Sequence, residues 1–377
     1  MFEKKIYFLC MTLCCCAYVL VVQKILGRRR PSLLGNAPPN ILAFLLPVIW
    51  FFVVAALQVN YGDTPFYRHS YALTGSFQKP VLRFGAESLF GWVSYIASLP
   101  EELERDGIVY VGLWVVFICA ALFILPAMLV FYRYAESNAM AIFLFVSLGI
   151  YGTSMNGIRQ FAATGLMLLG THFFFHPRWK RALFFLLFVL LAYTFHASAL
   201  FLIPVFFIVR LRAFSKAILL VILGAAAAVL FSGIIMPGVM HQIEGTTYDI
   251  YTTDAWNEGG STLLRVVISA IPPALAYFHR DRFREMGRSG DILINTSTII
   301  VAINIIGIYD WIFVRLAIYL YVYQILLICK VFSVMKRERG VRHPLVWGLF
   351  LMYCVHGWLY GMAIDLVNPW ISWLKPA

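Results

Sequence analysis

Three arginines interrupt apolar stretches of the sequence, and each lies close to one end of its stretch. Arg159 begins one stretch, Arg265 lies just inside a second, and Arg315 lies one helical turn into a third. A charge within a membrane span costs about 2.5–3.5 kcal/mol, so such residues usually face the protein interior and have partners. Arginine keeps its charge and binds phosphate oxygens through paired hydrogen bonds. The three residues together predict a binding site for a multiply charged anion.

Each arginine taken alone has a simpler interpretation. Its side chain could extend to the membrane interface, or it could pair with a nearby carboxylate, as Asp310 could with Arg315. Polar neighbours at helical spacings of three and four favour a shared site. These sets are Asn156, Arg159, Gln160 and Ala163, provided that their helix begins early, and Arg315 with Tyr319.

A reaction that activates a hydroxyl group needs a proton acceptor within hydrogen-bond reach. His196 is the first candidate, because it lies at an expected tip between two apolar runs. Asp63 and Glu87 are the second and third candidates, ranked only slightly below His196. A lone histidine between apolar runs is also a common core residue, so a structural role for His196 stays open.

The composition places these residues in a membrane. Hydrophobic residues make up 62% of the 377 residues and charged residues 13%, whereas soluble domains are about half apolar and a quarter charged. The net charge of +12 does not indicate nucleic-acid binding, because the basic residues fall in short clusters such as “HPRWKR” and “RLRAFSK”. Clusters of this kind between apolar runs mark cytoplasmic loops. We therefore expect one integral membrane domain over residues 1–377.

No motif indicates a cofactor or a metal. The seven cysteines all lie in apolar runs, which gives neither a disulfide framework nor a zinc-binding spacing. The sequence also contains no P-loop, no Gly-x-Gly-x-x-Gly and no Asp-x-Asp. We expect chemistry without metal or cofactor, on a substrate that arrives already activated.

A membrane-spanning helix needs about 20 apolar residues. The expected spans are 6–24, 40–58, 107–131, 139–155, 160–176, 216–236, 263–279, 291–309, 311–333 and 344–364. Residues 181–209 have basic clusters at both ends, so they predict two short or bent spans with a tip at 195–198. The expected fold class is all-α, a polytopic membrane helical bundle with about 11–12 transmembrane helices.

With these spans the basic clusters lie on one side, which charge bias makes the cytoplasmic one. Lys4 and Lys5 are the exception. Residues 87–99 are too short to span comfortably, so we expect an interfacial or re-entrant piece. The outer face then carries two loops, about 59–106 and about 237–262, rich in aromatic, acidic and amide side chains. Such side chains suit carbohydrate, although any exposed loop can have this composition.

The stretch “NGIRQFAATGLMLLGTHFFFHPRWKRALFFLLFVLLAYTFHASALFLIP” (156–204) resembles the EpsG family of membrane glycan polymerases, which are related in function to the Wzy polymerases. It has the Asn-x-x-Arg-Gln motif, the basic turn and the His-x-Ser-Ala ending of that family. “GDTPFYRHSY”, “ESLFGWVSYIASL” and “VRLAIYLYVYQILLI” resemble its outer Asp–Tyr–Tyr segment, its Glu-led amphipathic piece and its late Arg-x-x-x-Tyr span.

The resemblance implies the following site positions: Asp63, Tyr67, Tyr71, Glu87, Asn156, Arg159, Gln160, His196, Ser198, Arg315 and Tyr319. Arg265 is included because of its position in the expected topology, and no motif of the family supports it. His196, Asp63 and Glu87 would be catalytic and the others would bind substrate or pyrophosphate. A bundle arranged like the GT-C glycosyltransferases is one form that the fold could take.

The implied reaction is metal-independent glycosyl transfer at the outer face of the bacterial inner (cytoplasmic) membrane. A glycan on a polyprenyl pyrophosphate, such as undecaprenyl pyrophosphate, is the implied donor, and a lipid-linked repeat unit is the acceptor. Flippase and chain-length regulator proteins are the implied partners, beside the lipid bilayer. The alternatives are a transporter or flippase of lipid-linked oligosaccharide, a membrane acyltransferase with His196 as its base, and a structural membrane scaffold.

Overall fold

The computed structural model describes residues 2–27, 38–58, 64, 89–98, 103–105, 108–110, 113–232 and 261–362. The chain divides into two compact units. Unit 1 consists of residues 1–200 and 335–377, and unit 2 of residues 201–334. Each unit is described by itself, and the single membrane domain over 1–377 stays a prediction. The two expected outer loops lie mostly outside the described residues.

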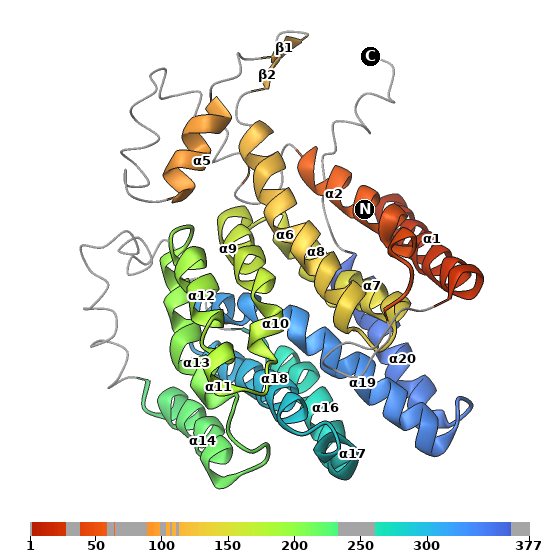
Figure 1. Cartoon of the computed structure of the whole chain (residues 1–377), viewed down its shortest axis with the longest axis vertical. Coiled ribbons are helices and arrows are strands. Elements are labelled where there is room, and N and C mark those ends of the chain that lie inside the picture. Colours follow the sequence, from red (N-terminus) through yellow and green to blue (C-terminus); the bar gives the residue numbers. More distant parts are fainter. Residues whose placement is uncertain are drawn as a thin grey trace. The chain divides into compact units, whose positions relative to one another are not determined.

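Unit 1 is built almost entirely from helices (Figure 1). Its elements are α1 (Phe2–Leu26), η1 (Ile41–Phe44), α2 (Leu45–Ala56), α5 (Leu89–Ser98), β1 (Leu103–Arg105), β2 (Ile108–Tyr110), α6 (Leu113–Tyr134), α7 (Asn138–Ser147), α8 (Ile150–Ser154), α9 (Ile158–Leu169), α10 (Thr171–Phe174), α11 (Trp179–Ala182), α12 (Phe185–Tyr193), η2 (Ala197–Phe201), which ends one residue into unit 2, α20 (Pro344–His356) and η6 (Gly357–Gly361). Strands β1 and β2 form a small antiparallel hairpin in which Leu103 pairs with Tyr110.

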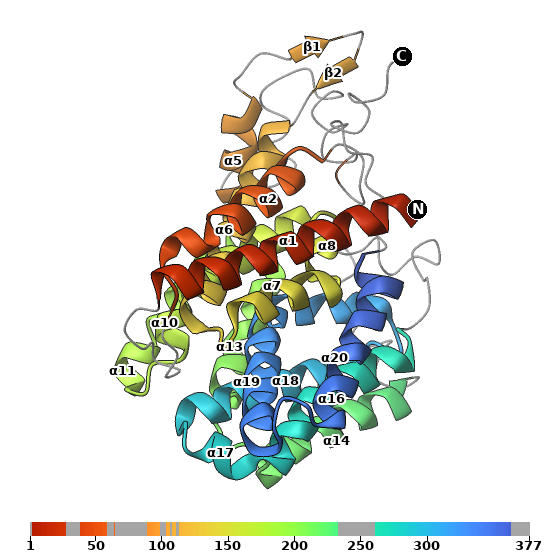
Figure 2. The same cartoon turned by 90° about the vertical axis from the view of Figure 1, so that its right-hand side faces the viewer.

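Helix α9 packs against both α6 and α12, and α6 also packs against α2 (Figure 1). Figure 2 shows α1 running alongside α7. The close approach of α6 and α9 depends on Gly165, because a Cβ atom there would meet the carbonyl oxygen of Leu122 and the Cα of Phe123. Small residues at such contacts let membrane helices approach and gain van der Waals contact. Gly165 therefore helps to fix the position of α9, which carries Arg159.

Unit 2 is arranged around one long buried helix, α18 (Arg288–Ile306). Its other elements are α13 (Leu202–Ile208), α14 (Lys216–Leu230), α16 (Leu263–Phe278), α17 (Arg280–Arg284), η5 (Trp311–Tyr319) and α19 (Tyr321–Arg339), which continues into unit 1. Helices α14 and α16 and the 3-10 helix η5 all pack against α18. The contacts of α18 therefore organise unit 2.

The described helices confirm the all-α polytopic membrane fold. Three of them are long and apolar enough to span a membrane: Lys5–Leu26, Trp114–Tyr134 and Arg288–Ile306. The pair η5 and α19 makes a fourth span if its 68° bend lies within one crossing. Each remaining expected span contains at least one shorter described helix. The total of about 11–12 spans stays a prediction.

Several expected spans are broken instead of continuous. Residues 139–155 form α7 and α8, separated at Gly149, whose φ of 74° favours glycine. Residues 160–176 form α9 and α10, and residues 311–333 form η5 and α19. The span expected at 107–131 begins only at Leu113, because residues 108–110 belong to strand β2. Hydropathy is averaged over a whole stretch of residues. It therefore identifies an apolar stretch but not a break in the helix within that stretch.

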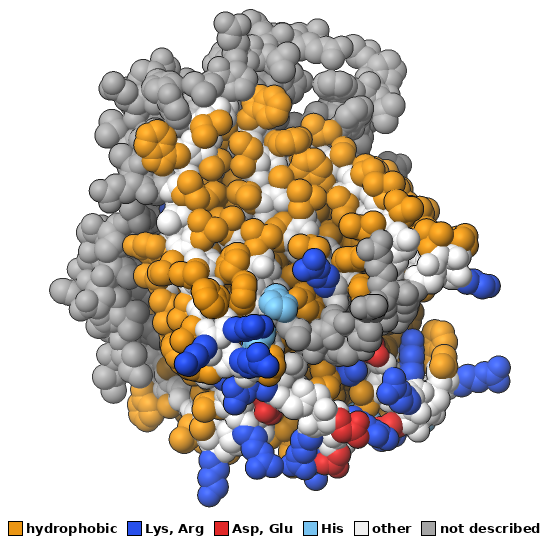
Figure 3. All heavy atoms as spheres, in the orientation of Figure 1, with side chains coloured by type: hydrophobic (Ala, Val, Ile, Leu, Met, Phe, Trp, Pro, Cys, Tyr) orange, Lys and Arg blue, Asp and Glu red, His pale blue; other side chains and the backbone are white. Residues whose placement is uncertain are grey.

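One end of unit 2 carries two basic clusters side by side. The Asn295 amide donates to the carbonyl oxygens of Val209 (3.1 Å) and Leu211 (2.7 Å), and Asp291 accepts from the Ala213 N–H (2.8 Å). These bonds hold “RLRAFSK” beside the start of α18, where “HRDRFREMGR” ends. In Figure 3, Lys and Arg side chains gather around the position that α17 has in Figure 1. The two clusters therefore share one side, as predicted.

In unit 1, the end of α1 lies beside the start of α7. Gln23, near the end of α1, donates to Asn138 at the start of α7 (2.8 Å). The other end holds Lys5, which the charge rule did not explain. Its ammonium donates to the carbonyl oxygen of Trp358 (2.9 Å) and lies 5.8 Å from the centre of that ring. This contact gives the exceptional cation a partner within unit 1.

Candidate active site

Arg159 stands at the second position of α9 and is held by two other elements of unit 1. Its Nε donates a hydrogen bond to the carbonyl oxygen of Phe195, 2.6 Å away. Its guanidinium carbon lies 5.2 Å from the centre of the Phe90 ring, which is within the range of cation–π attraction. The half-buried side chain is therefore fixed before any substrate binds.

The turn that binds Arg159 also carries the candidate base. Helix α12 ends at Tyr193 and η2 begins at Ala197, so the chain turns where the sequence predicted. Within this turn Ser198 Oγ and His196 Nδ1 are hydrogen-bonded at 2.7 Å. Because Phe195 directly precedes His196, the backbone bond to Arg159 brings the cation and the His–Ser pair into one site.

The short helix α5 closes this site on one side. Its 10 residues extend about 15 Å, which is half of the roughly 30 Å of a bilayer core. This length fits the interfacial or re-entrant piece that we expected. The Phe90 N–H donates to the carbonyl oxygen of Thr194 (3.4 Å), and the Phe90 ring lies 5.9 Å from that of Phe195. Leu89, Trp92 and Ile96 are exposed.

Asn156 and Gln160 differ from the prediction. Helix α9 begins at Ile158, after Gly157, so Asn156 lies in the preceding turn, where its N–H donates to the carbonyl oxygen of Thr153 (3.0 Å). The expected common helix face was therefore wrong for Asn156, because the helix does not begin early. Gln160 is buried at 3% exposure and Asn156 is half-buried.

Arg265 lies in the first turn of α16 in unit 2, and its side chain is exposed. The expectation of an arginine that faces the interior was wrong here, because the residue stands at the end of its helix. Near the start of α19, the Gln324 amide donates to the carbonyl oxygen of Ser269 in α16 (3.3 Å). Arg265 therefore belongs to the end of unit 2 where α16 begins and η5 gives way to α19.

Arg315 lies in η5, and its guanidinium carbon is 5.4 Å from the centre of the Trp311 ring. A 3-10 helix has three residues per turn, so residues four apart lie about 120° apart around its axis. The prediction that Arg315 shares a helix face with Tyr319 was therefore wrong; Arg315 is half-buried and Tyr319 is fully buried. The Asp310 carboxylate caps η5 by accepting from the Ile312 N–H (2.9 Å).

Four predicted site residues, Asp63, Glu87, Tyr67 and Tyr71, lie outside the described residues. Arg159 belongs to unit 1, whereas Arg265 and Arg315 belong to unit 2, so convergence of the three arginines stays a prediction. Within the described parts of the chain, no three His, Cys, Asp or Glu side chains gather in a group that could hold a metal ion.

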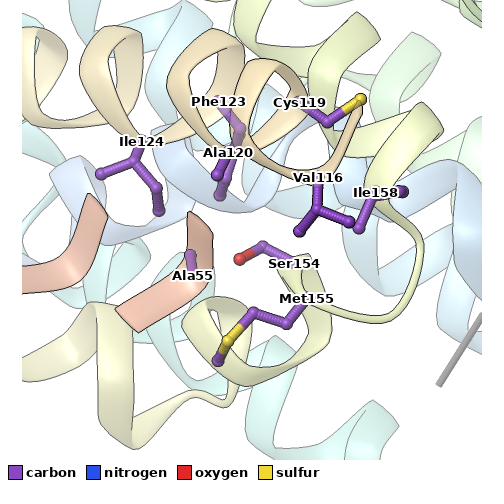
Figure 4. A pocket seen from close by; sticks show the side chains of 9 residues that line it. All are labelled: Ala55, Val116, Cys119, Ala120, Phe123, Ile124, Ser154, Met155 and Ile158. Carbon is purple, nitrogen blue, oxygen red and sulfur yellow. The ribbon is translucent and has the colours of Figure 1, made fainter. Parts of the chain in front are cut away.

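A small cavity lies in unit 1 between α2, α6 and the turn from α8 to α9. Its volume is about 10 Å³, which is close to the least that one water molecule needs. Figure 4 shows Ser154 and Met155 on one side of it and Val116 and Cys119 on the other. The Ser154 hydroxyl donates to the Tyr151 carbonyl oxygen (2.6 Å). The cavity is too small for a lipid chain or a sugar.

Sequence reasoning missed the residues that position Arg159. Phe90 was inside the amphipathic piece but was not singled out. The Gln58 amide donates to Thr64 Oγ1 (2.6 Å) and to the Met155 carbonyl oxygen (3.0 Å), and Thr64 Oγ1 donates to that same carbonyl (3.1 Å). These buried bonds fix the turn before α9. In the sequence, these bonds were indicated only by an uncharged glutamine, Gln58, at the end of an apolar run.

A model of the EpsG family matches residues 41–372 of the chain. The chain belongs to the EpsG family. The match covers the Arg159 site, the Arg315 segment and most of the expected spans. Membership indicates a membrane protein that acts as a glycan polymerase, with a lipid-linked substrate. No curated protein and no solved structure matches the chain, so the GT-C-like arrangement of this EpsG-family protein stays a prediction.

Proposed function

We propose that this protein is a polysaccharide polymerase of the bacterial cytoplasmic membrane. It transfers a growing glycan from a polyprenyl-pyrophosphate carrier to a second lipid-linked repeat unit at the outer face, in exopolysaccharide or O-antigen synthesis. The observation that carries the proposal is the fixed position of Arg159 beside the His196–Ser198 pair. A flippase and a chain-length regulator are the proposed partners.

In the proposed reaction, a hydroxyl oxygen of the acceptor sugar forms a bond to the anomeric carbon of the donor glycan. The bond from that carbon to the pyrophosphate oxygen breaks, and its electron pair leaves with the carrier. Negative charge therefore develops on the pyrophosphate, where fixed cationic donors lower the barrier. A guanidinium has five N–H donors, so Arg159 can bind the Phe195 carbonyl and a pyrophosphate oxygen together. No metal is needed in this scheme.

The hydroxyl proton passes to a base, for which His196 is the first candidate. If His196 Nδ1–H donates to Ser198 Oγ, the other ring nitrogen, Nε2, keeps its lone pair and can accept a proton. Ser198 then orients the ring, as second partners of catalytic histidines do. Asp63 and Glu87 remain the other candidates for the base. Arg265, Arg315, Asn156, Gln160, Tyr67, Tyr71 and Tyr319 complete the proposed substrate-binding set.

The decisive experiment is reconstitution of the purified protein in liposomes with a lipid-linked repeat unit and no other protein. We expect the glycan to lengthen, as seen by mass spectrometry of the released oligosaccharide. Movement of the lipid across the bilayer without lengthening would indicate a flippase. Acyl transfer from a thioester donor to the glycan would indicate an acyltransferase, and either result contradicts the proposal.

The proposed outer position of Arg265 can be tested with a matched pair of single cysteines in unit 2. Thr262 is exposed at the α16 end that carries Arg265, and Arg284 is exposed at the basic end. In a background without the native cysteines, Thr262→Cys should react with an impermeant thiol reagent in intact spheroplasts. Arg284→Cys should react only after the membrane is opened. The reverse pattern would place Arg265 on the cytoplasmic side and contradict its place in the proposed substrate-binding set.

A further inference from the structure

Asn304 is a buried amide in α18 whose hydrogen-bonding groups are unused within the described residues. The residue is 1% exposed, and neither its Nδ2 nor its Oδ1 has a hydrogen-bond partner there. Buried polar groups in native structures are nearly always paired, and in a membrane an unpaired polar group costs several kcal/mol. Because the described residues do not use it, this amide is available to a bound substrate.

The periodicity of α18 shows where this amide points. Ser297 lies seven residues before Asn304, which is close to two helical turns, so the two share a face. The Gln324 amide donates to Ser297 Oγ (3.3 Å) and to the Ser269 carbonyl oxygen (3.3 Å). These contacts turn the face of α18 that carries Ser297 towards α16 and α19. Asn304 therefore lies on an interior face of unit 2 and not on a face exposed to lipid.

A second unpartnered group lies close to Asn304. The carbonyl oxygen of Gly307, one turn further along the chain, accepts from the Ser261 N–H (2.6 Å). The Ser261 hydroxyl is also buried and has no hydrogen-bond partner within the described residues. Ser261 precedes α16 and lies four residues before Arg265 in the sequence. Two unused polar groups thus gather at the end of unit 2 where Arg265 and Arg315 are found.

The chemistry of these groups suits the sugar part of the substrate better than its pyrophosphate. An amide offers a donor and an acceptor, and a serine hydroxyl offers both as well. A phosphate oxygen can only accept, whereas a sugar hydroxyl donates and accepts. We propose that Asn304 and Ser261 form a binding site for sugar hydroxyl groups of the lipid-linked glycan. This inference rests on the proposed polymerase function, and it assigns unit 2 a carbohydrate-binding role beside the anion-binding role of its arginines.

The test compares two leucine substitutions in the same helix. Leucine has the same number of side-chain heavy atoms as asparagine, branched at the same carbon, and no polar atoms. Asn304→Leu therefore removes the unused polar groups, and the melting temperature should stay equal or rise. The control, Asn295→Leu, removes the bonds to Val209 and Leu211 and should lower it. Asn304→Leu should also slow glycan lengthening about tenfold or more, since it removes both a donor and an acceptor of hydrogen bonds to the substrate. Ser261→Ala should slow it less.

A binding measurement separates this inference from the polymerase proposal. The melting temperature of the wild-type protein should rise with a purified lipid-linked repeat unit more than with bare undecaprenyl pyrophosphate. Asn304→Leu should lose that difference and keep the response to undecaprenyl pyrophosphate. Normal lengthening by Asn304→Leu, or a fall in its melting temperature like that of Asn295→Leu, overturns the inference. A wild-type protein that binds the repeat unit in this way but never lengthens it overturns only the polymerase proposal.

Discussion

Arg159 and Arg315 lie in different units and are positioned by different means. Arg159 is held through tertiary contacts, with a carbonyl 36 residues away and a ring from α5. Arg315 rests on Trp311 of its own helix, and its direction is set by the 3-10 geometry of η5 and the following 68° bend. The first arginine is fixed by packing between elements, and the second by the shape of one element.

This difference predicts how each site responds to change. A site held by tertiary contacts should depend on the exact side chain and on the helices around it. A site whose cation is positioned by one bent helix should tolerate exchange of that cation for another. Its activity should depend on the backbone geometry of η5. Long 3-10 stretches within helices often mark functional hinges, so the unit 2 site is also the better candidate for movement during turnover.

The largest effect is expected from Arg159→Ala. Removing one preorganised donor to a developing negative charge costs about 10²–10³ in rate, so glycan lengthening should fall by that factor in liposomes. In cells, polymer should be lost while protein abundance and single lipid-linked repeat units stay unchanged. Full-length polymer at normal levels would exclude a pyrophosphate contact by Arg159.

The second effect concerns the packing that places Arg159. Gly165→Ala forces a Cβ atom against the backbone of Leu122 and Phe123, so α6 and α9 must separate. Overpacking of this kind costs about 1–3 kcal/mol, which should lower both the melting temperature and the rate. Gly224→Ala in α14 is the control, because nothing lies within 4 Å of its Cβ position. Equal melting temperatures for the two variants would contradict the close α6–α9 contact.

The third test exchanges arginine for lysine at both sites. Lysine has a single nitrogen, so Arg159→Lys cannot bind the Phe195 carbonyl and an anion together in the way a guanidinium can. Loss of one charge-assisted hydrogen bond costs about 1.5–3 kcal/mol, so we expect about a tenfold or larger loss in kcat. Arg315→Lys keeps a cation that can lie over the Trp311 ring and should lose less. The distinction between the two sites fails if Arg315→Lys is the more damaging change.

The smallest effect is expected from Phe90→Leu. Leucine keeps an apolar side chain at this fully buried position but offers no ring face to the guanidinium. A cation–π contact of about 0.5–1 kcal/mol corresponds to a roughly two- to fivefold loss of rate, which conservative changes elsewhere should not cause. The control is Phe51→Leu, equally buried but packed against Phe145 and Tyr151. The same loss of rate in both variants would indicate a general packing effect.

The positions of the helices could be predicted from the sequence because hydropathy and charge act locally. A run of apolar residues must leave water wherever the rest of the chain lies, so the stretches around α1, α6 and α18 were found. The turn at 195–198 could also be predicted, because the apolar stretch that contains it has basic clusters at both ends. The prediction that the basic clusters and Arg159 lie on opposite sides rests on the cost of moving charge across a membrane.

The directions of the site residues could not be predicted, because they depend on contacts between distant segments. The start of α9 at Ile158 separates Asn156 from the face of Arg159, and the 3-10 form of η5 separates Arg315 from Tyr319. Both outcomes depend on the backbone conformation where a helix is broken. This conformation cannot be read from the summed hydropathy or charge of the side chains. A residue spacing of three or four identifies neighbours only where the helix is continuous and α-helical.

The sequence alone thus determined a membrane protein of the EpsG family, the stretches that form its helices, and the end of each unit where its unusual arginines lie. Only the tertiary structure decided that Arg159 binds the backbone beside His196, that Phe90 covers its guanidinium, and that the Asn304 amide is buried with no partner among the described residues. The physical reason is the distance along the chain over which each property is decided. Burial of apolar stretches is a local property of the chain, whereas a hydrogen bond, or its absence, is decided by residues that only folding brings together.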